Sequence, residues 1–214
     1  HYAVRTGEGL FRGRDRSKDQ SYFLALVPRR IMDACVFPLG RLTKDGARRM
    51  VEEAGLPFIP RESQDLCFVP DRRGEPGPVV TDDGRHVGVH RGLGHYTVGQ
   101  RRGVGAHGRP MYVIRLEPRE NRLVVGEAEE LYSPACTAVG INDLEMPREE
   151  VFEAEVQLRS RHRPVSGTVA RKGDRCDVAF RTPQKAVAPG QLAVFYRRDR
   201  VLGAGTIVGR PSDG

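Results

Sequence analysis

Residues 191–208 have the sequence QLAVFYRRDRVLGAGTIV, in which two apolar runs are separated by a polar turn. The runs cover 191–196 and 201–208, and Arg198-Asp199-Arg200 lies between them. This arrangement predicts a β-hairpin. Further strands are predicted near residues 135–141, 151–159, 164–170 and 175–181. Six short strands within about eighty residues favour a small barrel or a sandwich, and the pattern leaves both open.

The middle of the chain contains two more hairpin patterns. Val79-Val80 and the stretch 87–89 flank Thr81-Asp82-Asp83-Gly84, whose Asp-Gly pair is a strong turn signal. The apolar runs 111–116 and 123–125 flank a polar turn in the same way. Together they predict a small β domain.

The first sixty residues have a helical pattern. Leu24, Val27 and Ile31 recur at helical spacing, and Pro28 is suited to the start of a second short helix. Residues 43–55 form a clearer amphipathic helix, with Thr43 as the N-cap and a glycine just past the end. A helix this short must dock its apolar stripe on another element, and a sheet is the expected partner. Helices followed by strands indicate a multi-domain chain rather than one alternating α/β unit.

Composition limits the functional classes. The chain has 214 residues with 25 Gly and 15 Pro, which favours many short elements. No apolar run reaches the length of a bilayer span, and no signal-peptide core is present, so we expect no membrane association and a cytoplasmic location. The net charge is +7, and 31 of the 35 basic residues are arginine. Arginine binds phosphate in bidentate fashion, although genome composition is an equally good explanation of its excess.

The four cysteines are Cys35, Cys67, Cys136 and Cys176. They form no CxxC pair and no metal-ligand spacing with the six histidines, so no metal site is predicted. A disulfide framework is not expected in a chain this long with so few cysteines, and the expected environment is a reducing cytoplasm. From composition alone each cysteine, Cys67 between Leu66 and Phe68 included, is most simply a buried apolar residue.

Three polar stretches are candidates for chemistry. Residues 18–22 place a cation, a carboxylate and an amide together, residues 94–105 combine glycines with a basic pair and Tyr96, and residues 159–163 contain three arginines. The last two could hold a phosphate backbone. Each has an ordinary alternative as well: an N-terminal helical turn, a set of glycine turns and a solvated rim.

These stretches are part of a longer set of motifs by which the chain resembles the tRNA-specific 2-thiouridylases. The motifs occur in the family's order across essentially the whole sequence. They are Leu10-Phe11-Arg12-Gly13-Arg14-Asp15, Lys18-Asp19-Gln20-Ser21-Tyr22-Phe23-Leu24, Phe37-Pro38-Leu39-Gly40, Ala54-Gly55-Leu56-Pro57, Ser63-Gln64-Asp65-Leu66-Cys67-Phe68, Tyr96-Thr97-Val98-Gly99-Gln100-Arg101-Arg102-Gly103 and Pro189-Gly190-Gln191-Leu192-Ala193-Val194-Phe195-Tyr196. Members of this family have also been labelled tRNA methyltransferases, but nothing here resembles a methyl-donor site.

The resemblance implies an activity and a set of site residues. The family uses ATP to adenylate the C2 oxygen of a wobble uridine in tRNA, and a cysteine persulfide, charged by a sulfur-donor protein, then delivers sulfur. Cys67 falls on the persulfide-bearing cysteine. The tRNA contacts fall on His1, Lys18, Asp19, Gln20, Arg159, Ser160 and Gln191. Partners are therefore expected to be tRNA and a sulfur donor, with no DNA.

The resemblance also implies an α+β, multi-domain fold. Residues 1–66 would be the C-terminal helical remnant of an α/β ATP-pyrophosphatase domain, residues 67–132 a central β domain and residues 133–214 a C-terminal β-barrel. The family's Ser-Gly-Gly-x-Asp-Ser loop for ATP and its other catalytic cysteine are absent from this sequence. We therefore expect the C-terminal part of a thiouridylase, inactive alone. The alternatives are a non-catalytic RNA-binding β-barrel module and a barrel that regulates translation factors.

Overall fold

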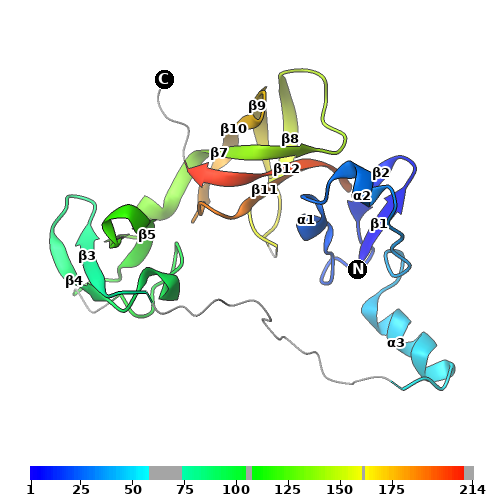
Figure 1. The fold of residues 1–214 in the computed structure, drawn as a ribbon, viewed down its shortest axis with the longest axis horizontal. Coiled ribbons are helices and arrows are strands. Elements are labelled where there is room, and N and C mark those ends of the chain that lie inside the picture. Colours follow the sequence, from blue (N-terminus) through cyan, green and yellow to red (C-terminus); the bar gives the residue numbers. More distant parts are fainter. Residues whose placement is uncertain (58–73, 105–107, 161, 210–214) are drawn as a thin grey trace. The chain divides into compact units, whose positions relative to one another are not determined.

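A computed structural model describes residues 1–57, 74–104, 108–160 and 162–209 (Figure 1). The chain divides into two compact units. Unit 1 combines His1–Ser63, Cys136–Thr182 and Pro189–Gly214, and unit 2 combines Gln64–Ala135 with Pro183–Ala188. The N-terminal segment thus shares a unit with the C-terminal strands. The division into three domains remains a prediction.

Unit 1 is built mainly on the strands predicted near the C-terminus. They are β7 (Tyr132–Asp143), β8 (Val151–Gln157), β9 (Val165–Lys172), β10 (Arg175–Lys185), β11 (Leu192–Arg197) and β12 (Arg200–Gly209). The sheet order in the described ranges is β1-β2-β12-β11-β8-β9-β10-β7, and β12 also pairs with β7. That last pairing closes a ring of six strands, which confirms the barrel and decides against the sandwich.

The first residues differ from the helical expectation. β1 (Ala3–Thr6) and β2 (Gly9–Arg12) form an antiparallel hairpin, and Phe11 of β2 pairs with Arg200 of β12. The Arg12 amide also donates to the Asp199 carbonyl at 2.8 Å. Strands of four residues are too short to show an alternating pattern. They form here because the edge of the barrel sheet supplies hydrogen-bond partners.

The helices that follow the hairpin are short. They are α1 (Ser21–Leu24), α2 (Arg29–Met32) after Pro28, and α3 (Lys44–Glu53). The Thr43 side chain accepts a hydrogen bond from the Gly46 amide, as predicted for an N-cap. No residue of α3 is buried, so the predicted docking of its apolar stripe is not seen within the described ranges. In the structure, residues 1–57 therefore contain three short helices and a β-hairpin, and are less helical than predicted.

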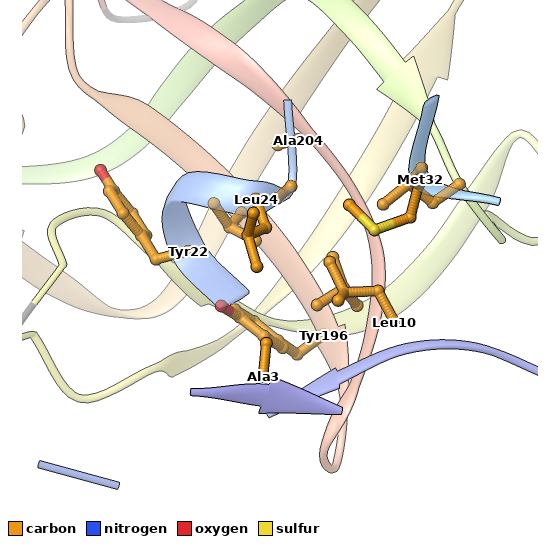
Figure 2. Packing of buried hydrophobic residues seen from close by; sticks show 11 residues of the cluster. Ala3, Leu10, Tyr22, Leu24, Met32, Tyr196 and Ala204 are labelled. Carbon is orange, nitrogen blue, oxygen red and sulfur yellow. The ribbon is translucent and has the colours of Figure 1, made fainter. Parts of the chain in front are cut away.

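A hydrophobic cluster joins the N-terminal segment to the barrel. Figure 2 shows Leu10, Leu24 and Met32 packed with Tyr196 of β11 and Ala204 of β12. Tyr196 is fully buried and Leu10 nearly so. Burial of such side chains contributes about 25 cal/mol for each Å² of apolar surface. This packing fixes residues 1–32 against the strands that carry the C-terminal motifs.

Unit 2 contains a separate four-stranded sheet. Its strands are β3 (Gly77–Thr81), β4 (His86–His90), β5 (Tyr112–Glu117) and β6 (Arg122–Gly126), with short 3-10 turns η1 (Leu93–His95), η2 (Pro118–Glu120) and η3 (Glu129–Leu131). Both predicted hairpins are confirmed, because β3 pairs with β4 and β5 with β6, each antiparallel. A parallel pairing between β3 and β6 joins the two hairpins.

Candidate nucleic-acid interface

The turn at residues 18–22 is held together by the Asp19 carboxylate. Its Oδ1 accepts hydrogen bonds from the amides of Gly13 and Ser21, both at 3.0 Å, and its Oδ2 accepts one from the Ser21 hydroxyl at 2.9 Å. Gly13 has to be glycine, since a Cβ there would lie 2.4 Å from the Tyr2 carbonyl oxygen. Asp19 is only partly exposed, and its carboxylate sets the shape of the turn.

His1 and Gln20 lie beside each other at the same turn. The Gln20 Oε1 atom is 3.1 Å from His1 Nδ1 and accepts a hydrogen bond from the Tyr2 amide at 3.2 Å. The His1 ring also meets the Phe37 ring edge to face at 5.9 Å. The exposed His1 side chain is therefore held in place although it comes first in the chain. Four of the predicted tRNA-contact residues, His1, Lys18, Asp19 and Gln20, thus lie at the same turn.

Tyr22 connects this turn to two distant segments. Its hydroxyl accepts a hydrogen bond from the Leu192 amide at 3.2 Å, and its hydrogen has two acceptors in reach, the Leu192 carbonyl oxygen at 3.2 Å and the Leu158 carbonyl oxygen at 3.4 Å. The side chain is 3% exposed, and this burial raises the pKa of its hydroxyl, so it stays a neutral hydrogen-bonding group. Leu158 precedes Arg159 and Leu192 follows Gln191. The predicted contact residues of three separate motifs are therefore positioned around one buried tyrosine.

A second buried path links the turn to residues 159–160. The Ser21 hydroxyl, whose hydrogen goes to Asp19, lies 3.1 Å from the Tyr196 hydroxyl, which must therefore be the donor in this pair. Burial raises the pKa of Tyr196 to about 12. The guanidinium carbon of Arg12 lies 3.7 Å from the centre of the Tyr196 ring, which is a cation–π contact.

Gln157 completes the path. Its Oε1 accepts a hydrogen bond from Arg12 Nη2 at 3.1 Å, and its Nε2 donates to the carbonyls of Arg159 and Ser160 at 2.9 and 3.0 Å. Gln157 is 4% exposed, so its amide is satisfied by these protein groups rather than by water. The polar chain from Asp19 through Ser21, Tyr196, Arg12 and Gln157 ends at the backbone of the predicted contact pair.

The surface above these buried contacts is polar and basic. Arg159, Ser160 and Gln191 are exposed, and Lys18 is partly exposed. The backbone carbonyl of Gln191 accepts a hydrogen bond from the Ile207 amide at 2.8 Å. This bond fixes the backbone of Gln191, and the Gln191 side chain is at the surface. The seven predicted contact residues therefore lie in unit 1, on one connected framework. Cys67 and Arg161 lie outside the described residues.

Sequence analysis missed the residues that build this framework. Tyr22 and Arg12 lie inside the quoted motifs, yet their pattern does not show what they contact. Gln157 continues the alternation of apolar and polar residues in β8, which places it on the face of the exposed Glu153 and Glu155. The structure buries it instead, directly after the buried Val156, so the sequence contained no signal for its role.

The other candidate stretch, residues 94–105, has a structural role in its described part. Tyr96 is 9% exposed in the core of unit 2, and its hydroxyl donates to the Gly103 carbonyl at 3.3 Å. A buried ring has no free face on which a base could stack. Gly99 and Gly103 have φ angles of 87° and 82°, which explains the glycines by turn geometry.

Cys136 and Cys176 are buried in the barrel. Burial raises the pKa of the Cys136 thiol to about 12 and that of the Cys176 thiol to about 11. Both thiols are therefore protonated and unreactive near neutral pH. Cys35 is partly exposed, and its thiol lies 3.3 Å from the Ile31 carbonyl.

No helix in the described part of the chain is long and apolar enough to cross a bilayer. No group of three or more His, Cys, Asp or Glu side chains in those residues is arranged to hold a metal ion. The framework is thus one of arginines, amides and hydroxyls, which are groups suited to contacts with phosphate and sugar oxygens.

Comparison with known families covers almost the whole chain. Residues 1–71 match a tRNA methyl transferase HUP domain, residues 68–127 a tRNA methyl transferase PRC-barrel domain, and residues 136–207 an aminomethyltransferase beta-barrel domain. The six strands of the closed barrel lie largely within the last match.

Curated relatives give the same assignment. The chain is 43% identical to a tRNA-specific 2-thiouridylase of Carboxydothermus hydrogenoformans, covering 93% of this chain and 59% of the relative. It is 42% identical to the tRNA-specific 2-thiouridylase of Nitratidesulfovibrio vulgaris, and the match covers 98% of this chain and 66% of the relative. It is 40% identical to a tRNA-specific 2-thiouridylase of Syntrophus aciditrophicus, and that match covers 97% of this chain and 73% of the relative. The chain thus spans about three fifths to two thirds of the first two relatives.

Proposed function

The chain belongs to the tRNA-specific 2-thiouridylase family, and on that premise we propose that it acts in tRNA wobble-uridine 2-thiolation in the cytoplasm. Its part is to hold tRNA through His1, Lys18, Asp19, Gln20, Arg159, Ser160 and Gln191, and to carry the transferred sulfur on Cys67. The partners are tRNA and a protein that donates persulfide sulfur.

One observation carries the tRNA part of the proposal. The three predicted contact segments, residues 18–20, 159–160 and 191, are joined by the Tyr22 hydroxyl and by the polar chain through Gln157. A shared framework holds these segments in fixed positions relative to one another, as contacts to one RNA strand require. Preorganised contacts bind RNA more tightly, because less side-chain and loop ordering remains to be done on binding.

The chemical step is proposed by family resemblance. ATP would supply the adenylation that turns the uridine C2 oxygen into a leaving group. No residue of this chain is assigned to that step, because the sequence contains no Ser-Gly-Gly-x-Asp-Ser phosphate loop. The terminal sulfur of a persulfide on Cys67 would then attack C2 and displace the activated oxygen as AMP, which leaves the base joined to Cys67 by an S–S bond. A second thiol, by resemblance the family's other catalytic cysteine, would attack the Cys67 sulfur, so that the S–S bond breaks, the outer sulfur stays on C2 and the two cysteines form a disulfide.

Salt dependence of tRNA binding tests the interface. If about four phosphates are neutralised, the affinity of the protein for tRNA should fall by roughly tenfold or more between 50 and 200 mM salt. Arg159→Ala should lower the slope of log K against log salt by about one, because one cation no longer displaces a counterion. Gln191→Ala should weaken binding without changing the slope. Filter binding or fluorescence anisotropy measures both quantities.

Two results would count against this interface. Binding that does not respond to salt would contradict the role of the basic surface. Equal slopes for Arg159→Ala and the parent protein would remove Arg159 from the phosphate contacts. The alternative function, a non-catalytic RNA-binding barrel, is distinguished by a thiolation assay on the full-length protein that also contains the ATP-binding loop: the proposed function predicts sulfur transfer that depends on Cys67, and the alternative predicts salt-dependent binding without sulfur transfer.

A further inference from the structure

A pocket of about 630 Å³ opens in unit 1 next to the turn between β11 and β12. None of the seven proposed contact residues lines it. Its charged lining consists of Arg12, Arg16, Arg181, Arg197 and Arg198 with Glu153, Glu155 and Asp199. Guanidinium groups therefore exceed carboxylates by two in this pocket.

The ion pairs in the pocket do not neutralise the excess of guanidinium groups over carboxylates. Arg16 pairs with Asp199 at 2.6 Å, and Arg181 lies 3.6 Å from Glu153. Within the described ranges, Arg12, Arg197 and Arg198 have no carboxylate partner. Three cations therefore face one unpaired carboxylate, that of Glu155. A pocket with this balance favours an anion.

Arg12 is held in a fixed orientation at the pocket wall. Its guanidinium lies on the Tyr196 ring at 3.7 Å, and Nη2 donates to the buried Gln157 Oε1. A guanidinium has five N–H donors, and in the described part of the chain only this one is used. The remaining donors form a planar fork of the shape that binds phosphate oxygens. Because its orientation is already set, little further ordering is required on binding.

The turn that carries Arg197 and Arg198 is also fixed. The Arg12 amide donates to the Asp199 carbonyl at 2.8 Å, which ties the turn to β2. Arg198 adopts a left-handed conformation with φ of 56°, a backbone geometry that few residues other than glycine take up without cost. The exposed cations of this turn are thus presented on a constrained backbone.

We propose that this pocket binds backbone phosphates of the tRNA and so extends the proposed interface beyond residues 159–160. The inference rests on the proposed function, and the buried Gln157 side chain links Arg12 at the pocket wall to the backbone of residues 159–160. Three unpaired guanidiniums suit a strand with successive phosphates. The pocket offers no open aromatic face, since Tyr196 is fully buried, and this favours backbone contacts over binding of a free nucleotide through its base.

Three substitutions in the intact protein test the pocket by tRNA binding at several salt concentrations. Arg197→Ala should weaken binding about fivefold at 100 mM salt and lower the salt slope by about one. Arg12→Lys keeps the charge but loses the fork, so binding should weaken about threefold with little change in slope. Glu155→Gln removes the unpaired carboxylate and should tighten binding about twofold or more, a gain that misfolding cannot imitate.

Arg49→Ala on α3 is the matched control, because Arg49 is exposed, has no ion pair in the described residues and does not line the pocket. It should leave affinity near the parent value. Equal losses for Arg49→Ala and Arg197→Ala, or no gain from Glu155→Gln, would overturn the pocket proposal, as would competition by millimolar AMP that clearly exceeds the competition by inorganic phosphate at the same ionic strength. If Arg159→Ala still weakens binding in the same experiment, only the pocket fails; if it does not, the proposed function fails as well.

Discussion

Cys67→Ser is expected to abolish sulfur transfer to tRNA in an assay where the unsubstituted protein is active. Serine is nearly the same size as cysteine, but its hydroxyl cannot hold a persulfide sulfur and is a far poorer nucleophile near neutral pH. We expect activity to fall by about a hundredfold or more, while tRNA binding and thermal unfolding stay near the parent values. Thiolated uridine in the tRNA product is the quantity to measure.

The other three cysteines provide controls. Cys136→Ser and Cys176→Ser change buried thiols whose pKa is raised to about 12 and 11, so they should reduce stability and not chemistry. Cys35→Ser, at a partly exposed site, should change neither. Wild-type thiolation by Cys67→Ser would remove Cys67 from the proposed role, and a loss of thiolation in a well-folded Cys136→Ser protein would contradict the purely structural role of Cys136.

Gln157→Leu is expected to weaken tRNA binding by about tenfold. The amide is buried and makes three hydrogen bonds, one from Arg12 and two to the carbonyls of Arg159 and Ser160. Leucine fills similar space but supports none of them, so residues 159–160 must be ordered by the RNA itself, at a cost of about 1 kcal/mol per side chain. The free energy of unfolding should fall by about 2 kcal/mol, from the lost hydrogen bonds.

A second buried polar group separates positioning from simple destabilisation. Thr137 is 1% exposed in the same barrel, and its hydroxyl donates to Asp177 at 2.7 Å. Thr137→Val should also reduce stability by about 1 kcal/mol but should leave tRNA affinity unchanged. Denaturant unfolding and anisotropy on both variants distinguish the two effects. If Thr137→Val and Gln157→Leu weaken tRNA binding equally, Gln157 has no specific role in the interface.

Local sequence pattern was sufficient for most of the strands. Residues 152–157 alternate between apolar and polar, and Arg198-Asp199-Arg200 separates two apolar runs, so β8, β11 and β12 were predicted within a few residues of their bounds. The hairpin turn at residues 81–84 followed from its Asp-Gly pair. These strands and turns depend on residues that are close together in the chain, so the local sequence pattern is enough to predict them.

Family motifs predict the candidate site residues. They predict tRNA contacts at residues 18–20, 159–160 and 191, and a catalytic role for Cys67, which lies outside the described residues. They did not explain why these segments belong together. Residues far apart in the chain contribute the buried groups that join them, and their motifs carry no information about distance.

Sequence alone determined the family, the strand-rich C-terminal half and the residues to test. Only the tertiary structure decided that the barrel closes through β12 and β7, that residues 3–12 add a hairpin to its edge, and that Tyr22 and Gln157 connect the contact segments. The physical reason is the same in each case. Pairing of distant strands and satisfaction of buried polar groups depend on partners more than a hundred residues away, as with the 145-residue separation of Arg12 and Gln157, and no local pattern specifies such partners.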